Sequence, residues 1–309
     1  MSNDFDNNYV PRHAKGNYYK KKNNNYEDEM SFDIDVKDSM YEREKKFSIS
    51  YIFIFIFLVI IGYSLYHVVL WGIDNKKTKD VTNKIDSNVE VVEVLDDDNT
   101  LIVSSEDDSD NLYWYFVKFP LIDVDLSKLK NDNNDTVGWI NINNTNINYP
   151  FVQTIDNDYY LDHSFDKKYN EAGWLFLDYR NNHDFSDRNN VIYGHSRLDK
   201  TMFGSLNKVL KRDWYSNRDN HVIRISLDNE NTLWQVFSVY KIKTESYYIT
   251  TNFNNDSEYL KFLDTISKRS IYDFDVHLDK DDKVLTLSTC YSDTERTVVH
   301  ARLIKRSSK

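Results

Sequence analysis

The clearest indication of how this chain folds is the run VLTLSTC, residues Val284–Cys290, close to the C-terminus. The run is apolar and rich in threonine and contains no glycine or proline, which predicts a β-strand. It ends at the only cysteine of the 309 residues. Because the thiolate is the reactive form of cysteine and a nearby cation favours it, Arg296 makes Cys290 a candidate nucleophile.

A second strand-like run, Asn190–Tyr193, leads directly into Gly194 and His195. A single cysteine together with a histidine that is distant in the sequence is typical of candidate thiol enzymes. A histidine at the end of one strand can exchange protons with a thiol at the end of another. The pattern therefore predicts a thiol site that combines Cys290 with His195.

The final strand-like runs, Val284–Cys290 and Arg296–Lys305, predict a hairpin joined by the short turn Tyr291–Glu295. Side chains alternate between the two faces of a strand, so such a turn can bring Arg296 beside Cys290. A guanidinium there can stabilise a thiolate or the oxyanion of a tetrahedral intermediate.

Each of these residues also has a purely structural interpretation. Cys290 can be an inert core residue, since cysteine is among the most buried residue types. His195 can be an ordinary loop histidine. Arg296 can form a surface ion pair with Glu295 or Asp293.

The composition narrows the class of protein. A net charge of −11 argues against a nucleic-acid binder, which would present a basic face. Seven glycines and three prolines exclude collagen-like and proline-rich architectures. One cysteine permits no internal disulfide and excludes a zinc site built from several cysteines.

Four segments are expected along the chain. Residues 1–46 are polar and read as a disordered cytoplasmic tail. Residues 47–71 read as an uncleaved transmembrane anchor, because the uncharged run Tyr51–Leu70 is about 20 residues long, enough to span a bilayer. Residues 72–110 are acidic and predict a linker or stalk, and residues 111–309 a catalytic domain. Basic residues before the anchor favour a cytoplasmic N-terminus and an extracellular domain.

The expected main domain is mainly β, since several short strands separated by turn signals favour a barrel or a sandwich. Strands are expected at 89–95, 137–142, 147–152, 173–177, 190–193, 221–226, 233–243, 284–290 and 296–305. Helices are expected at 202–215 and 258–268, a helical turn at 156–163, and one or two short helices within 111–130.

Several segments, taken in chain order, resemble the class B sortases. They are DTVGWI (135–140), NYPFVQ (148–153), DNDYYL (156–161), FLD (176–178), IYGH (192–195), TLSTC (286–290) and RTVVHA (296–301). The likeness extends from Asn111 to Lys305, and the ordered set is more specific than any single motif. The chain departs from the family pattern in a shorter spacing from Cys290 to Arg296, in Ser196 where an asparagine often follows the histidine, and in the bulky pair 174–175.

The resemblance implies an eight-stranded sortase-type β-barrel with peripheral helices, and a membrane-anchored cysteine transpeptidase of a Gram-positive surface. It implies that Cys290 attacks the carbonyl after the threonine of a C-terminal sorting signal, that His195 transfers protons, and that Arg296 stabilises the oxyanion. An amine of a cell-wall peptide precursor or of a pilin lysine would then accept the acyl group. The residues that would line the substrate groove are Asn157, Leu161, Tyr193, Ser288 and Tyr291.

Two other functions remain open at this stage. One is a thiol peptidase in which water resolves the same acyl-enzyme, and the other is a non-catalytic surface binding protein on the same barrel. The expected partners are surface proteins with sorting signals, the peptidoglycan precursor and, through residues 47–71, the membrane. No nucleic acid and no cofactor are expected. No metal is expected either, because the acidic turn of Asp279, Asp281 and Asp282 reads as a solvated loop.

Overall fold

The computed structural model describes residues 49–103, 111–243, 245–290 and 295–309. The chain separates into a unit that ends at Phe55 and a unit from Ile56 to Lys309. The predicted tail, residues 1–46, lies outside the described residues.

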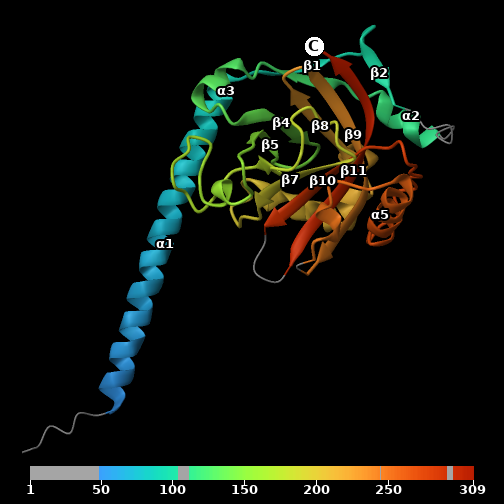
Figure 1. Ribbon diagram of the computed structural model, residues 1–309. Coiled ribbons are helices and arrows are strands. Elements are labelled where there is room, and N and C mark those ends of the chain that lie inside the picture. Colours follow the sequence, from blue (N-terminus) through green and yellow to red (C-terminus); the bar gives the residue numbers. More distant parts are fainter. Residues whose placement is uncertain (1–48, 104–110, 244, 291–294) are drawn as a thin grey trace, which may run out of the picture. The chain divides into compact units, whose positions relative to one another are not determined.

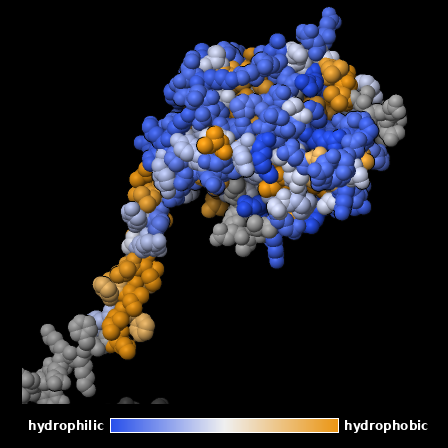
Figure 2. Space-filling view, viewed as in Figure 1, coloured by the Kyte–Doolittle hydropathy of each residue, from blue (hydrophilic) through white to orange (hydrophobic). Residues whose placement is uncertain are grey.

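Helix α1 (Ile49–Asn88) contains most of the predicted anchor and is long and apolar enough to cross a membrane. Its apolar side chains are exposed along the first part of the helix, where Tyr63 is 66% exposed (Figure 2). Burial of such residues in hydrocarbon rather than in protein is what a membrane anchor requires.

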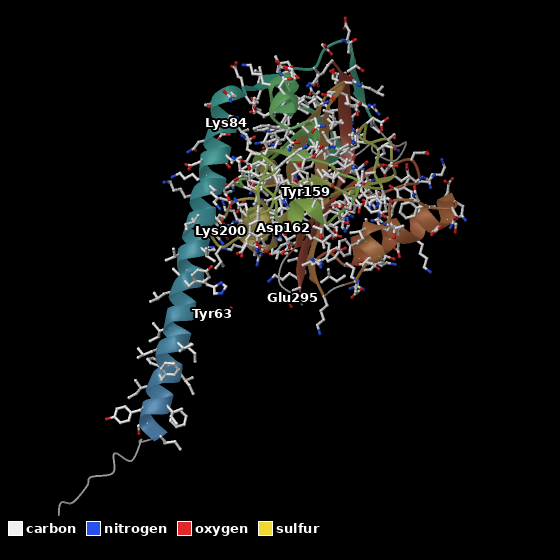
Figure 3. All side chains as sticks on the ribbon, turned by 60° about the vertical axis from the view of Figure 1, so that its left-hand side comes forward. Tyr63, Lys84, Tyr159, Asp162, Lys200 and Glu295 are labelled. Atoms are coloured by element: carbon white, nitrogen blue, oxygen red, sulfur yellow. The ribbon has the colours of Figure 1, made fainter. Side chains whose placement is uncertain are left out.

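The same helix continues through residues 72–88, where the sequence predicted a polar stalk. Contacts within the second unit account for this difference. The Asn170 amide donates a hydrogen bond of 2.9 Å to the Thr78 hydroxyl. The ammonium of Lys84, which is labelled on α1 in Figure 3, lies 2.9 Å from the carboxylate of Asp132. Tertiary contacts of this kind stabilise helices whose composition alone predicts little order.

The main domain is a closed eight-stranded β-barrel (Figure 1). Its strands, in spatial order, are β10 (Val284–Cys290), β7 (Asn189–His195), β6 (Phe176–Leu177), β5 (Asn148–Val152), β4 (Thr136–Ile142), β8 (Val222–Leu227), β9 (Glu230–Ile242) and β11 (Arg296–Ser308). Antiparallel pairing of β10 with β11 closes the ring, which confirms the predicted barrel. Outside the ring, β2 (Thr100–Ile102) pairs with β11, and β1 (Val91–Val94) pairs with β3 (Leu121–Val124).

The peripheral helices are short. They are α2 (Asn111–Val117), α3 (Ser127–Asp132), α4 (Arg212–Tyr215), α5 (Asp256–Lys268) and the 3₁₀ helices η1 (Tyr159–Leu161), η2 (Phe203–Leu210), η3 (Arg218–His221) and η4 (Tyr247–Ile249). Helix α5 was predicted, and the Asn255 side chain caps it by accepting a 2.9 Å hydrogen bond from the Glu258 N–H.

Three local expectations were wrong. The single helix expected at 202–215 is η2 followed by α4, because the buried residues Phe203, Leu206 and Val209 recur every third residue, which is the period of a 3₁₀ helix. Lys211 is extended and separates the two helices. The strand expected at 173–177 contains only β6, and β3 lies in a region where only helices were expected.

The hydrophobic core contains large buried side chains, among them Trp139, Trp174 and Trp234, each at most 1% exposed. Strands β9 and β11 run antiparallel along the whole barrel, with Arg296 opposite Ile242 at one end and Ser308 opposite Glu230 at the other. We call the end of the barrel at Arg296 the groove end and the end at Ser308 the far end.

Candidate active site

Three strand termini meet at the groove end. Strands β7 and β10 are parallel and in register, with Thr289 opposite Gly194 and Cys290 opposite His195. In the antiparallel β10–β11 pair, Ser288 lies opposite Val298. Two residues further along the same register, position 290 lies opposite position 296. The backbone positions of the predicted nucleophile, acid–base and guanidinium are therefore neighbours. Cys290 is described by its backbone alone.

His195 is partly exposed at the end of β7 and is held by the loop that contains η1. Its Nε2 atom lies 2.6 Å from the Leu161 carbonyl oxygen. Since a carbonyl only accepts, Nε2 carries the proton in the neutral ring, and Nδ1 is the nitrogen that can take up another.

A glycine makes this close approach possible. Gly173 has a φ of +57°, and a Cβ atom there would lie 2.5 Å from the Tyr160 carbonyl and 2.9 Å from Cδ2 of His195. A side chain at this position would push the η1 carbonyls or the imidazole ring away.

A groove of about 500 Å³ opens beside these strand ends. Its lining residues are Asn157, Leu161, Phe176, Tyr193, Glu245, Ser246, Tyr248, Ile249 and Arg296. They include Arg296 and three of the five predicted substrate-binding residues. A largely apolar surface with a few polar groups is typical of a site that binds an extended peptide or another organic ligand.

The other two predicted substrate residues are placed differently. Ser288 is 1% exposed and does not line the groove, although its hydroxyl lies 3.1 Å from the hydroxyl of Tyr248, which does. Tyr291 lies outside the described residues.

Arg296 lies at the start of β11 and forms no ion pair within the part of the chain that the structure describes. Its neighbour Glu295 is paired instead with Lys241, at 3.9 Å. The alternative Arg296–Glu295 pair is therefore not formed. Asp293, the other suggested partner, lies outside the described residues.

A buried carboxylate lies behind the groove. Asp178 is fully buried and accepts hydrogen bonds from the Tyr193 hydroxyl at 2.8 Å and the Asn157 amide at 3.1 Å. Arg180 approaches it with Nε at 2.8 Å and a terminal nitrogen at 2.7 Å. Burial alone would raise the pKa of Asp178, but the hydrogen bonds and charge of Arg180 and the hydrogen bond from Tyr193 outweigh it, and the pKa is lowered.

The same arginine reaches the opposite wall. It donates a 2.9 Å hydrogen bond to the carbonyl of Ile249, which lines the groove. The Asp178–Arg180 pair thus connects both walls. Sequence reasoning missed its role, although Asp178 belongs to the FLD segment of the family resemblance.

A closed eight-stranded barrel with cysteine, histidine and arginine at adjoining strand ends defines a cysteine transpeptidase of the sortase type. Comparison with known proteins gives the same class. A family model described as the Sortase domain matches residues 140–304.

The relatives place the chain more narrowly. Sortase B of Listeria monocytogenes is 38% identical over 180 residues, which cover 58% of this chain and 70% of the relative. Sortase B of Staphylococcus aureus is 39% identical over 188 residues, 59% and 75% of the two chains. The solved Staphylococcus aureus sortase B–substrate complex is 36% identical, with a TM-score of 0.55 over 58% of this chain and 84% of that one. The present chain belongs to the sortase family, in its class B.

Proposed function

We propose that this protein cleaves a C-terminal sorting signal after its threonine and transfers the acyl group to an amine of a cell-wall precursor or a pilin. The observation that carries the proposal is the β7–β10 register, which pairs Cys290 with His195 beside an open groove. The solved sortase B–substrate complex of the staphylococcal relative supports substrate binding by a protein of this family.

The proposed reaction has two steps. The Cys290 thiolate attacks the threonine carbonyl, the S–C bond forms, and the amide C–N bond breaks as the His195 imidazolium protonates the leaving amine. The incoming amine then attacks the thioester, loses its proton to His195 and releases the thiolate. The Arg296 guanidinium stabilises the oxyanion of both tetrahedral intermediates.

The groove supplies substrate binding in this proposal. Leu161 and Tyr193 contact the sorting peptide through apolar surface, and the Asn157 amide donates to the peptide backbone. The Asn157 carbonyl oxygen already accepts a 3.0 Å hydrogen bond from the Tyr179 N–H, and one N–H of its amide donates to Asp178. The second N–H of the amide is therefore the group that remains for a ligand. Ser288 supports the groove through Tyr248. Tyr291, the residue after Cys290 in the sequence, remains a proposed substrate-binding residue.

The apolar part of α1 anchors the enzyme in the membrane. We place the N-terminus in the cytoplasm and residues 111–309, as the catalytic domain, outside the cell, because basic residues are more numerous before the anchor. This orientation brings the groove to the side of the membrane on which surface proteins and cell-wall precursors meet.

The proposal is tested with a fluorogenic sorting peptide, with and without an amine acceptor. We expect Cys290→Ala to abolish cleavage, and we expect added amine to give a transfer product. The acyl-enzyme should be trapped on Cys290 and its peptide identified by mass spectrometry. Cleavage that survives in Cys290→Ala would exclude the mechanism, and release by water that is indifferent to amine would favour the thiol peptidase.

A further inference from the structure

A chain of hydrogen bonds runs behind the three strand ends. The Asn207 amide nitrogen donates to the Ser196 hydroxyl at 2.8 Å, and the Thr297 hydroxyl donates to the Asn207 carbonyl oxygen at 2.6 Å. The backbone N–H of Thr297 then donates to the Thr289 hydroxyl at 2.9 Å.

Apart from Asn207, every residue of this chain of hydrogen bonds is the sequence neighbour of a proposed catalytic residue. Ser196 follows His195, Thr297 follows Arg296, and Thr289 precedes Cys290. Neighbouring residues of a strand point to opposite faces, so Thr297 holds β11 from the face opposite to the one on which Arg296 lines the groove. Thr297 is 2% exposed and Thr289 is fully buried, so little water competes for the bond between them, whereas Asn207 and Ser196 are partly exposed.

Asn207 itself is held in place by the helix that carries it. On η2, Phe203 and Leu206 are fully buried in the barrel core. The residue before the helix, Met202, forms a backbone bridge with Ser196. The helix is therefore fixed against the loop that follows His195, and the Asn207 side chain reaches from there to β11.

We propose that Asn207 is a positioning residue that sets the spacing of His195, Arg296 and Cys290. It is not among the residues that line the groove, and it acts through Ser196 and Thr297. The inference rests on the proposed transpeptidase function. A rigid link between the backbones of catalytic groups is valuable because a displacement of about 1 Å can cost about 100-fold in rate.

The test compares two substitutions of nearly equal size. Asn207→Leu removes both hydrogen bonds, and we expect kcat for the fluorogenic peptide to fall about tenfold or more while KM changes less than about twofold. Asn207→Asp keeps both bonds, because the Ser196 and Thr297 hydroxyls can each donate to the carboxylate. We expect it to retain kcat within about threefold.

A second pair of variants separates positioning from general stability. Thr297→Val loses the bond to Asn207 but keeps the backbone N–H that binds Thr289, and we expect a smaller fall in kcat than with Asn207→Leu. The control is Thr232→Val on β9, a buried threonine near the far end whose hydroxyl accepts a 2.8 Å hydrogen bond from Trp234. We expect it to lower the melting temperature without changing kcat.

The outcomes are distinguishable from failure of the proposed function. If the unmodified protein neither cleaves nor transfers, the transpeptidase proposal fails before any variant is compared. If the unmodified protein is active and Asn207→Leu keeps its kcat, or Asn207→Asp loses as much as Asn207→Leu, the positioning role is wrong. A rise in KM alone would also overturn it, since that would place Asn207 in substrate binding.

Discussion

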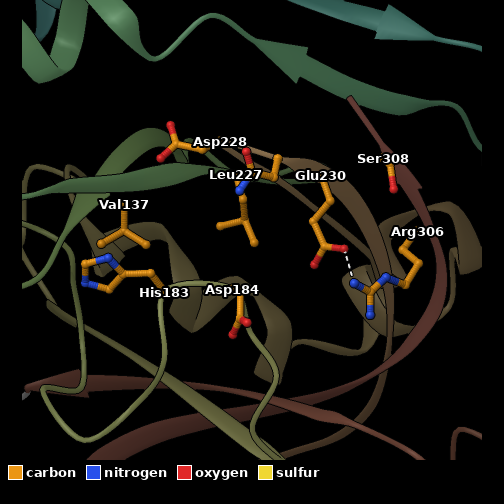
Figure 4. Close-up of a pocket in the computed structure, with 9 residues that line it drawn as sticks. Val137, His183, Asp184, Leu227, Asp228, Glu230, Arg306 and Ser308 are labelled. Atoms are coloured by element: carbon orange, nitrogen blue, oxygen red, sulfur yellow. Dashed lines mark ion pairs between the residues drawn. The ribbon is translucent and has the colours of Figure 1, made fainter.

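The two ends of the barrel each contain a buried carboxylate paired with an arginine. At the groove end the pair is Asp178–Arg180, with side chains 0% and 35% exposed. At the far end it is Glu230–Arg306, with side chains 10% and 39% exposed, in a separate cavity of about 240 Å³ (Figure 4). The pairs match in type and burial, so their differences report on their surroundings.

The surroundings shift the pKa values of the two carboxyl groups in opposite directions. The pKa of Asp178 is lowered despite its burial, because Arg180 and Tyr193 donate hydrogen bonds to it. The pKa of Glu230 is raised by burial, which outweighs the attraction of Arg306. At Glu230 the arginine does not offset burial, whereas at Asp178 the hydrogen bonds from Arg180, together with that from Tyr193, do. At the groove end, Tyr193 is itself a groove residue and Arg180 binds the backbone of Ile249, so ionisation of Asp178 is tied to the shape of the groove.

The strongest contrast concerns two arginines on β11. Arg296→Ala should lower kcat/KM for the sorting peptide about 100-fold or more, because it removes the proposed oxyanion donor. Arg306→Ala, at the other end of the same strand, should change kcat/KM less than about twofold. Steady-state kinetics with matched circular dichroism spectra checks both. Equal losses in the two variants would show that the ends are not functionally distinct.

Acid should act on stability through a residue that does not line the groove. His221 is buried, and burial lowers its pKa to about 4, so the unfolded chain, with a histidine pKa of about 6.5, binds more protons below neutrality. Its contribution is therefore present above about pH 6.5 and is lost as the pH falls toward 4, by up to about 3 kcal/mol.

His221→Gln should flatten the dependence of the free energy of unfolding on pH in that window, as measured by urea denaturation. Flattening should be partial, because burial also lowers the pKa of His300 to about 3 and that residue remains. The pH profile of kcat should stay unchanged. A profile that moves with His221→Gln would link this residue to the reaction.

Two glycines give a steric version of the same comparison. At the groove end, Gly173→Ala forces a side chain onto a φ of +57° and against His195, at a cost of about 1–3 kcal/mol and with a loss of activity. Gly138→Ala on β4 meets only the side chains of Phe151 and Leu227, at 2.7 and 2.8 Å. We expect it to destabilise the fold while activity per folded molecule is kept. Active-site titration combined with thermal melts distinguishes the two results.

Sequence reasoning succeeded where the pattern was long and repetitive. Strands β10 and β11 were predicted within a few residues, because each is a run rich in β-branched residues without glycine or proline. Helix α5 was predicted from its amphipathic spacing, which is also a long and regular pattern. The pairing of the final hairpin followed from the short turn between its strands.

It failed where long-range contacts decide the structure. Strands β2 and β6 have three and two residues, too few for a pattern, and each exists because a long neighbour offers free backbone groups. At the site, the importance of Asp178 depends on donors from distant segments, and Ser196 contacts Asn207 only because η2 folds back on the barrel. No local signal records such contacts.

The smallest expected effect tests the comparison of the two carboxylates. It is the sign with which the destabilisation caused by each substitution changes with pH. The lowered pKa of Asp178 means that its contribution to stability is present above the unfolded value of about 3.9 and is lost as the pH falls. The raised pKa of Glu230 means that its contribution is present below about 4.3 and is lost as the pH rises. The destabilisation caused by Asp178→Asn should therefore shrink toward low pH, and that caused by Glu230→Gln should shrink toward high pH.

Each substitution removes one titrating group, so it can change the pH dependence of the free energy of unfolding by at most about 1.4 kcal/mol per pH unit. Urea denaturation at half-unit intervals from pH 3 to 7 is needed to resolve a change of this size. Slopes of the same sign would mean that the two pairs are equivalent and that the donors from the groove wall do not hold Asp178 ionised. Opposite slopes would show that the surroundings of the two carboxylates shift their pKa values in opposite directions. Adding Tyr193→Phe to the series should then move the Asp178 slope toward that of Glu230, since it removes the 2.8 Å donor while leaving Arg180 in place.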